Sequence, residues 1–218
     1  MIRQVLLFGF VLLLASCKKE DDLSGIDLGY DYFPNKVGSY IIYDVDSTYY
    51  GVNTESYSFQ IKEELIEEFV DNEGEPNVKI NRFYRPANNT PWILIDVWTQ
   101  KRTTTTAEKV VDNIRYVKME FPVKNGGTWN GNAYNNYPAQ QYKYSNLAGF
   151  ADVGILQFDN TVTVEQLNNV NLVDEEIFYE VYAKGVGMVF RQATDLNTQG
   201  SQTSGYDVVY RAISYSIE

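Results

Sequence analysis

A period of two residues in the hydrophobic pattern constrains the fold of this chain more than any other feature of its sequence. After residue 30, large apolar side chains alternate with polar ones in several short stretches, as they do in a strand with one buried face. The clearest alternating sets are Tyr57, Phe59 and Ile61; Ile93, Ile95 and Val97; Val117, Met119 and Phe121; and Val209, Ile213, Tyr215 and Ile217. The 18 tyrosines, a residue type that favours strands, support the same conclusion. We therefore predict an all-β domain.

The expected strands lie near 38–50, 56–70, 77–86, 92–103, 108–120, 139–147, 160–166, 176–192 and 205–217. Turn-forming residues separate most of these stretches, so neighbouring strands are expected to pair antiparallel. About nine strands with little helix predict a strongly curved antiparallel sheet, either a half-barrel or a sandwich.

One stretch, 60–71, fits two secondary structures. Ile61, Leu65 and Phe69 are spaced as on one face of a helix. The alternation just upstream and the turn residues of 71–74 just downstream favour a long strand that ends in a hairpin. We predict a strand here, with the helix as the alternative.

The N-terminus predicts export and lipidation. Arg3 precedes an unbroken apolar run at 5–14, which would rise only about 15 Å as a helix, too short to span a bilayer. Leu14-Ala15-Ser16-Cys17 then resembles the lipobox of bacterial lipoproteins. We expect a signal peptide at 1–16, a lipidated flexible tether at 17–29, and one β-rich domain at 30–218.

Composition excludes several kinds of chemistry. The formal net charge of −11 disfavours binding to nucleic acid, whose phosphates would be repelled. The chain has no histidine, which removes the Ser-His-Asp triad, the Cys-His pair and the usual zinc sites. Its single cysteine is Cys17, which we expect to carry lipid, so neither a disulfide nor a catalytic thiol is available. We therefore expect no cofactor, no metal site and no enzymatic activity.

A further resemblance concerns the cellular address. Lys19, two residues after the cysteine, and the acidic residues that follow it resemble the export signal of surface lipoproteins of Bacteroidota. Parts of the domain, 32–34, 129–135 and 182–187, resemble uncharacterised lipoproteins of the same group. This resemblance implies a lipid-anchored protein of the outer membrane that faces the cell surface, and a β-rich fold, but no site residues. The glycine-rich stretch 182–187 is also similar to that of periplasmic lipid-carrier half-barrels, an analogy of fold alone.

The segment 129–142 is the strongest candidate for ligand contact. It gathers aromatic rings, which stack on sugars, and amides, which hydrogen-bond to hydroxyl groups. The candidate contact residues are Tyr134, Tyr137, Tyr142, Asn132 and Asn135. The alternative is an irregular loop that caps the core, and in either case we expect the side chain of Trp129 to point inward.

Three other clusters have weaker functional interpretations. Asp71, Glu73 and Glu75 lack the spacing of a calcium loop and predict a hairpin tip. The glutamates of 63–68 are expected on a solvated face, although two carboxylates from different strands could form a glycosidase pair. Arginines near strand ends favour stacking on aromatic rings, with a carboxylate-binding site as the alternative. These arginines are Arg82, Arg85 and Arg102, and the nearby aromatic residues are Tyr84, Trp92 and Trp98.

Together these observations predict a surface-tethered lipoprotein with a non-enzymatic binding or structural role. Its expected partners are the membrane, through lipid on Cys17, and a glycan or an envelope protein. Two alternatives stay open: a carrier of a hydrophobic ligand in a half-barrel cavity, and a histidine-free glycoside hydrolase that uses paired carboxylates.

Overall fold

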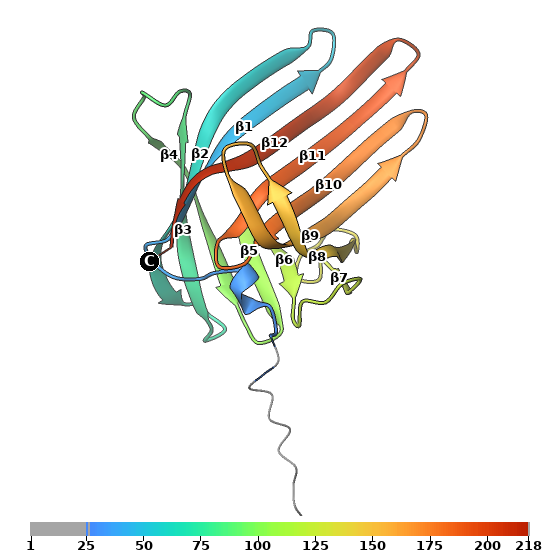
Figure 1. The fold of residues 1–218 in the computed structure, drawn as a ribbon. Coiled ribbons are helices and arrows are strands. Elements are labelled where there is room, and N and C mark those ends of the chain that lie inside the picture. Colours follow the sequence, from blue (N-terminus) through green and yellow to red (C-terminus); the bar gives the residue numbers. More distant parts are fainter. Residues whose placement is uncertain (1–24, 26, 218) are drawn as a thin grey trace, which may run out of the picture.

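The computed structural model of the chain describes residues 25 and 27–217. The predicted signal peptide, the predicted lipidation site Cys17 and most of the predicted tether lie outside the described residues. The described part consists of one short 3-10 helix, η2 (Tyr30–Tyr32), followed by strands joined by turns and loops (Figure 1).

Twelve antiparallel strands form a single sheet in the order β6-β5-β4-β3-β2-β1-β12-β11-β10-β9-β8-β7. Nearly every strand pairs with its neighbours in sequence, and β1 and β12 join the two halves. The strands are β1 (Tyr40–Tyr50), β2 (Glu55–Val70), β3 (Pro76–Arg85), β4 (Ile93–Arg102), β5 (Thr106–Val111), β6 (Ile114–Glu120), β7 (Thr128–Asn130), β8 (Gln141–Asp152), β9 (Gln157–Val170), β10 (Asp174–Ala183), β11 (Gly187–Gln199) and β12 (Gln202–Ser216).

The prediction of an all-β, strongly curved antiparallel sheet is confirmed, and the arrangement is a barrel-like sheet rather than a sandwich. The stretch 60–71 is strand, as predicted, because β2 continues to Val70. The expected number of about nine strands was too low. Two predicted strands are hairpins: Asp112 and Asn113 turn the chain at φ 51° and 64°, and residues 184–186 separate β10 from β11. The short strand β7 had no predicted counterpart.

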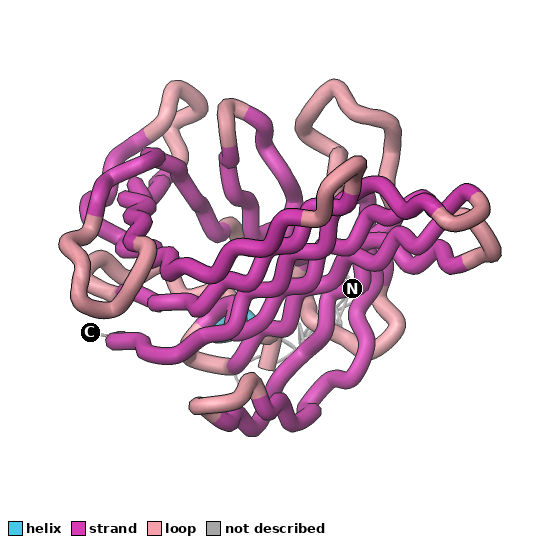
Figure 2. The backbone as a smooth tube through the Cα atoms, turned by 90° about the horizontal axis from the view of Figure 1, so that it is seen from above, coloured by secondary structure: helices cyan, strands magenta, loops and turns pink. Residues whose placement is uncertain are grey.

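The sheet curls until its two edges nearly meet, as the view from above shows (Figure 2). At this seam the backbone N–H of Val117 in β6 donates to the carbonyl oxygen of Gly131, just after β7, at 2.9 Å. The indole N–H of Trp129 in β7 donates to the carbonyl oxygen of Val117, also at 2.9 Å. The seam therefore has few hydrogen bonds compared with the long ladders elsewhere, and side chains inside the barrel contribute to its closure.

The segment 27–38, which we call the strap, crosses one end of the barrel. Arg102 of β4 donates to the carbonyl oxygens of Tyr30 and Phe33, and the N–H of Gly185 donates to the carbonyl oxygen of Asp31. Tyr32 and Phe33 are 4% and 5% exposed and join a core of side chains from β5 to β10. In Figure 1 the strap lies at the lower end, opposite the hairpins that rise at the upper right.

The prediction of which face of β4 is buried was wrong. Ile93, Ile95 and Val97 were predicted to face the core, but they are 56%, 42% and 53% exposed. The next residue, Trp98, faces the interior instead. Leu94, on the other face, is also 50% exposed, so the start of β4 is open to solvent on both faces, and its inward face further along carries Trp98 and Gln100.

Candidate binding site inside the barrel

A cavity of about 280 Å³ occupies the interior of the barrel. Side chains from every strand except β7 line it, which places it on the concave face of the sheet, and Phe33 and Pro34 of the strap close one end. Most of the wall is apolar or aromatic. The aromatic residues are Phe33, Tyr43, Trp98, Tyr116, Tyr142, Tyr182 and Tyr210, and the aliphatic ones include Ile41, Leu65, Ile80, Val111 and Met188.

The first of two ionic clusters in the cavity is centred on Glu63. Its carboxylate lies 2.6 Å from the amino group of Lys109 and 3.6 Å from Nε of Arg82. The strand β2 of Glu63 and the strand β5 of Lys109 are separated by two strands in the sheet, so this ion pair spans the interior. Burial by itself would raise the pKa of Glu63, but Lys109 and Arg82 more than offset it and the pKa is lowered.

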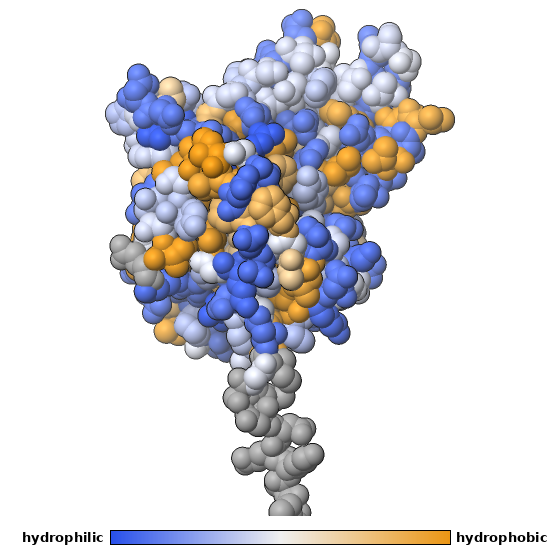
Figure 3. All heavy atoms as spheres, in the orientation of Figure 1, coloured by the Kyte–Doolittle hydropathy of each residue, from blue (hydrophilic) through white to orange (hydrophobic). Residues whose placement is uncertain are grey.

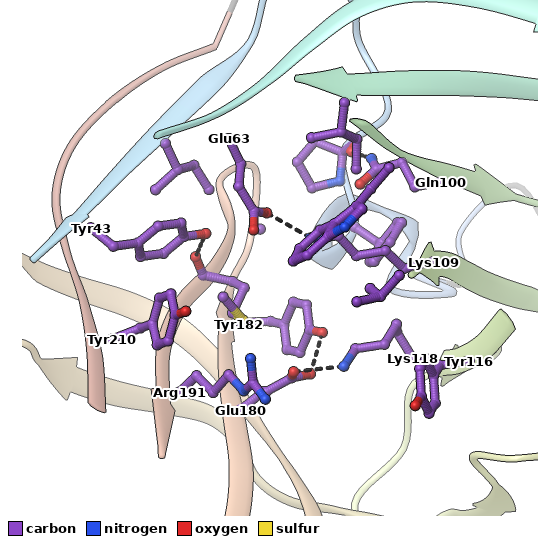
Figure 4. A pocket seen from close by; sticks show the side chains of 18 of the residues that line it. Tyr43, Glu63, Gln100, Lys109, Tyr116, Lys118, Glu180, Tyr182, Arg191 and Tyr210 are labelled. Atoms are coloured by element: carbon purple, nitrogen blue, oxygen red, sulfur yellow. Dashed lines mark hydrogen bonds and ion pairs between the residues drawn. The ribbon is translucent and has the colours of Figure 1, made fainter. Parts of the chain in front are cut away.

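The second cluster is centred on Glu180 of β10. Its carboxylate accepts hydrogen bonds from the amino group of Lys118 at 2.6 Å and the hydroxyl of Tyr182 at 2.7 Å (Figure 4). Burial by itself would raise the pKa of Glu180, but Lys118, Arg191 and the two hydrogen bonds lower it to about 2. Because Lys118 belongs to the edge strand β6, this ion pair also bridges the seam of the barrel.

The ionisation of Glu63 and Glu180 argues against the alternative that the chain is a glycoside hydrolase with paired carboxylates. A general acid must hold its proton near neutral pH, which requires a raised pKa. The pKa values of Glu63 and Glu180 are both lowered, so both carboxyls are ionised at neutral pH. Each is also engaged by a lysine at 2.6 Å. The pair therefore lacks the acid that glycoside hydrolysis needs.

The predicted contact residues of the segment 129–142 separate into two groups. Tyr142 is 4% exposed, and its ring lines the interior cavity. Tyr134 and Tyr137 are 54% and 52% exposed and flank a shallow outer hollow beside Arg115. The prediction that Trp129 points inward is confirmed, because it is 7% exposed and packs against Tyr142 and Tyr144.

The amides of this segment hold the loop itself. Asn132 donates to the carbonyl oxygen of Pro138 at 2.8 Å. Asn135 donates to the carbonyl oxygen of Arg115 and accepts from the backbone N–H of Tyr137, both at 2.9 Å. Because these groups are already bonded within the chain, they have little capacity left for the hydroxyl groups of a sugar.

The expected stacking of arginines on aromatic rings is confirmed. The guanidinium carbon of Arg82 lies 4.6 Å from the ring centre of Trp98, and that of Arg85 lies 4.2 Å from Trp92. Arg102 stacks on Tyr30 of the strap at 5.7 Å. Of the three arginines, only Arg82 lines the cavity.

The acidic cluster at the β2–β3 turn is a hairpin tip, as predicted. One carboxylate oxygen of Asp71 accepts the backbone N–H groups of Glu73 and Glu75, and the other accepts from the amide of Asn77. These hydrogen bonds lower the pKa of Asp71 to about 2. Within residues 25 and 27–217, no group of three or more acidic, histidine or cysteine side chains is arranged to hold a metal ion.

Sequence reasoning missed most of the charged residues of the cavity, namely Lys109, Lys118, Glu180 and Arg191. A signal was nevertheless present. Glu180 stands between Tyr179 and Val181 in a run that is otherwise apolar, as a charged residue buried on a strand face would. Local sequence could not show that this glutamate meets Lys118, which is 62 residues away in the chain.

No helix in the described part of the chain is long and apolar enough to span a membrane. No protein-family model matches the chain, no curated protein matches its sequence, and no solved structure matches its fold.

Proposed function

We propose that the barrel binds a small amphipathic molecule in its interior cavity and acts as a carrier or receptor without catalysing a reaction. The observation that carries this proposal is the cavity of about 280 Å³ itself, with apolar and aromatic walls and a few charged groups that converge on it. Concave, mostly apolar sites with a small number of placed polar groups are typical of small-molecule binding.

The side chains of the cavity remain accessible in part, which supports entry of a ligand. The side chains of Glu63, Arg82 and Lys109 are 11%, 13% and 14% exposed, and that of Lys118 is 14% exposed. A sealed structural core would not favour four ionisable groups at this level of exposure, because burying charge is costly. A cavity that is open to solvent and that a ligand can enter accounts for both the charges and their exposure.

The proposal extends to the cellular setting. The lipobox-like sequence before Cys17 and the acidic residues after it favour a lipid-anchored protein displayed on the outer membrane. The strap enters the barrel at one end, and the long hairpins β1–β2, β9–β10 and β11–β12 rise toward the other (Figure 1). An anchor that precedes the strap would thus hold the hairpin tips away from the membrane.

A test compares a variant that fills the cavity with one that does not. Val111 lines the cavity, whereas Val97 on the neighbouring strand is 53% exposed on the outside. The full-length wild type, Val111→Trp and Val97→Trp are screened against aromatic and aliphatic fragments by ligand-observed NMR. We expect binding by the wild type and Val97→Trp, and its loss in Val111→Trp. Absence of fragment binding by the wild type, or binding unchanged in Val111→Trp, would contradict the proposal.

A further inference from the structure

We infer that the cavity binds a small organic acid carrying one negative charge, and that Arg191 of β11 anchors the acid group. This inference rests on the proposed function and names the class of ligand. It starts from the balance of charges in the cavity wall. The whole chain has 18 lysines and arginines against 29 acidic residues, but the wall has four cationic residues against two carboxylates.

The pairing of these charges leaves one cation in excess. Glu63 is engaged by Lys109 and Arg82, and Glu180 by Lys118. Arg82 also lies 3.4 Å from Asp96, a third carboxylate, which is outside the cavity wall. Four cationic side chains are thus accompanied by three carboxylates, and a ligand with one negative charge would neutralise the remaining positive charge.

Arg191 is the cavity cation that makes no ion pair within the described residues, although its charge helps to lower the pKa of Glu180. It stands opposite Glu180 in the register of β10 and β11, yet Glu180 is engaged by Lys118 and Tyr182 instead. Among the described residues, the guanidinium of Arg191 makes no hydrogen bond or ion pair, and its central carbon lies 5.6 Å from the ring centre of Tyr210. Figure 4 shows it between Tyr210 and Glu180, within the ring of side chains that line the cavity. A guanidinium has five N–H donors and binds a carboxylate well with two of them.

N–H groups without a hydrogen-bond acceptor in the same cavity wall also favour an anionic ligand. Buried side-chain atoms without a hydrogen-bond partner include Nε1 of Trp98 and Nε2 of Gln166, and both residues line the cavity. Nε of Arg82 is paired with Glu63 at 3.6 Å but makes no hydrogen bond. Each of these atoms carries an N–H group, so what the wall lacks is an acceptor. The hydroxyl of Tyr210 accepts from Arg82 at 2.9 Å and keeps its own proton to donate. An acid group offers several acceptor lone pairs to such donors.

The aromatic side chains around these donors define the rest of the ligand. Tyr43, Trp98, Tyr182 and Tyr210 line the cavity, whose volume is about 280 Å³. This suits a compact aromatic or branched aliphatic body rather than a long acyl chain. Naphthalene-1-carboxylate has this form, and naphthalene-1-methanol is a neutral compound of nearly the same shape.

The experiment measures the affinity of both compounds for the full-length wild type, Arg191→Gln, Arg191→Lys and the control Arg211→Gln. Arg211 lies on the neighbouring strand, and its side chain is 38% exposed and paired with Asp46. The substitution Arg211→Gln therefore removes the same charge outside the cavity. We expect the wild type and Arg211→Gln to bind the carboxylate at least about tenfold more tightly than the alcohol, the scale of a charge-assisted hydrogen bond. Arg191→Gln should lose this preference and keep its affinity for the alcohol, while Arg191→Lys should retain part of the preference.

The outcomes separate this inference from the proposed function. Equal affinities of the wild type for the two compounds, or a preference that survives in Arg191→Gln, would overturn the assignment of an acidic ligand and leave interior binding standing. Failure of the wild type to bind either compound would contradict interior binding itself. Arg191→Lys is the control for misfolding. A folded protein that keeps the positive charge should keep part of its preference for the carboxylate over the alcohol.

Discussion

Glu180 shows most clearly how a single residue connects the fold to the site. Its side chain is 5% exposed, and it joins β10 to the edge strand β6 through Lys118. A buried carboxylate is stable only when its charge is compensated, and removal of one partner leaves the other charge unpaired. The same ion pair therefore closes the seam and sets the polarity of the cavity.

The lowered pKa of Glu180 predicts how stability depends on pH. The pKa falls from 4.5 to about 2 on folding, because Lys118, Arg191 and two hydrogen bonds outweigh the effect of burial. The unfolded chain thus binds the proton first as the pH falls. The stabilisation, about 3 kcal/mol, is complete above pH 4.5 or so and is lost as the pH falls toward 2.

Glu180→Gln should therefore lower the free energy of unfolding by about 3 kcal/mol at pH 7 and by progressively less as the pH falls below 4.5. Glu175→Gln, on the same strand but exposed, is the control and should change little. Urea unfolding at pH 7, 4.5 and 3 measures both variants. A deficit of the same size at every pH would count against an ionised, paired Glu180.

At the scale of elements, the strap has a distinct role. It brings Phe33 and Pro34 to one end of the cavity, and it is held by side chains from β4 and by isolated backbone hydrogen bonds rather than by a sheet ladder. Arg102 makes two of these hydrogen bonds, and Gln100 donates to the carbonyl oxygen of Pro34 at 2.9 Å. The side chains of β4 therefore supply part of the attachment of the strap, beside its backbone hydrogen bonds to other segments.

Arg102→Ala should loosen the strap and leave the sheet intact. The amides of Tyr32 and Phe33 donate to Gly29 and Tyr30 within the turn, and they should exchange with solvent faster in this variant. Arg85→Ala removes a stacked arginine that does not contact the strap and should leave this exchange unchanged. Hydrogen exchange followed by mass spectrometry makes the comparison. Equal protection of residues 27–38 in both variants would contradict the role given to Arg102.

The strands also show what a pattern of alternation can and cannot predict. Alternation identified β2 correctly because Phe59 and Ile61 continue into a long ladder with β1 and β3. On β4 the same reasoning located the strand but chose the wrong face, since Ile93, Ile95 and Val97 are exposed. A period of two gives two faces without saying which one is inside, and on β4 the inward face carries Trp98 and Gln100.

At the scale of the whole molecule, the site could not have been predicted from local sequence. The cavity takes its side chains from nearly all the strands, and its two lysine–glutamate pairs join residues 46 and 62 positions apart. Only the curl of the sheet brings these residues together. By contrast, the predicted segment 129–142 is contiguous in sequence, and it contributes only Tyr142 to the cavity wall.

The outer surface adds a second whole-molecule feature. Apolar side chains cluster at the β9–β10 hairpin tip, where Val170 and Leu172 are 59% and 99% exposed (Figure 3). The exposed tyrosines Tyr134 and Tyr137 lie elsewhere, near the short strand β7. Neither feature is enclosed as the cavity is, so the interior remains the stronger candidate for binding a small molecule.

The most direct test of interior binding uses the three tryptophans, whose indole N–H groups give separate NMR signals. Trp98 lines the cavity, Trp92 stacks on Arg85, and Trp129 packs in the core beside the seam. Titration of the full-length protein with naphthalene-1-carboxylate, with signals assigned by Trp→Phe variants, should shift the Trp98 signal in a saturable way and leave Trp92 unmoved. Saturable binding that shifts Trp92 and leaves Trp98 unchanged would contradict a ligand site inside the barrel.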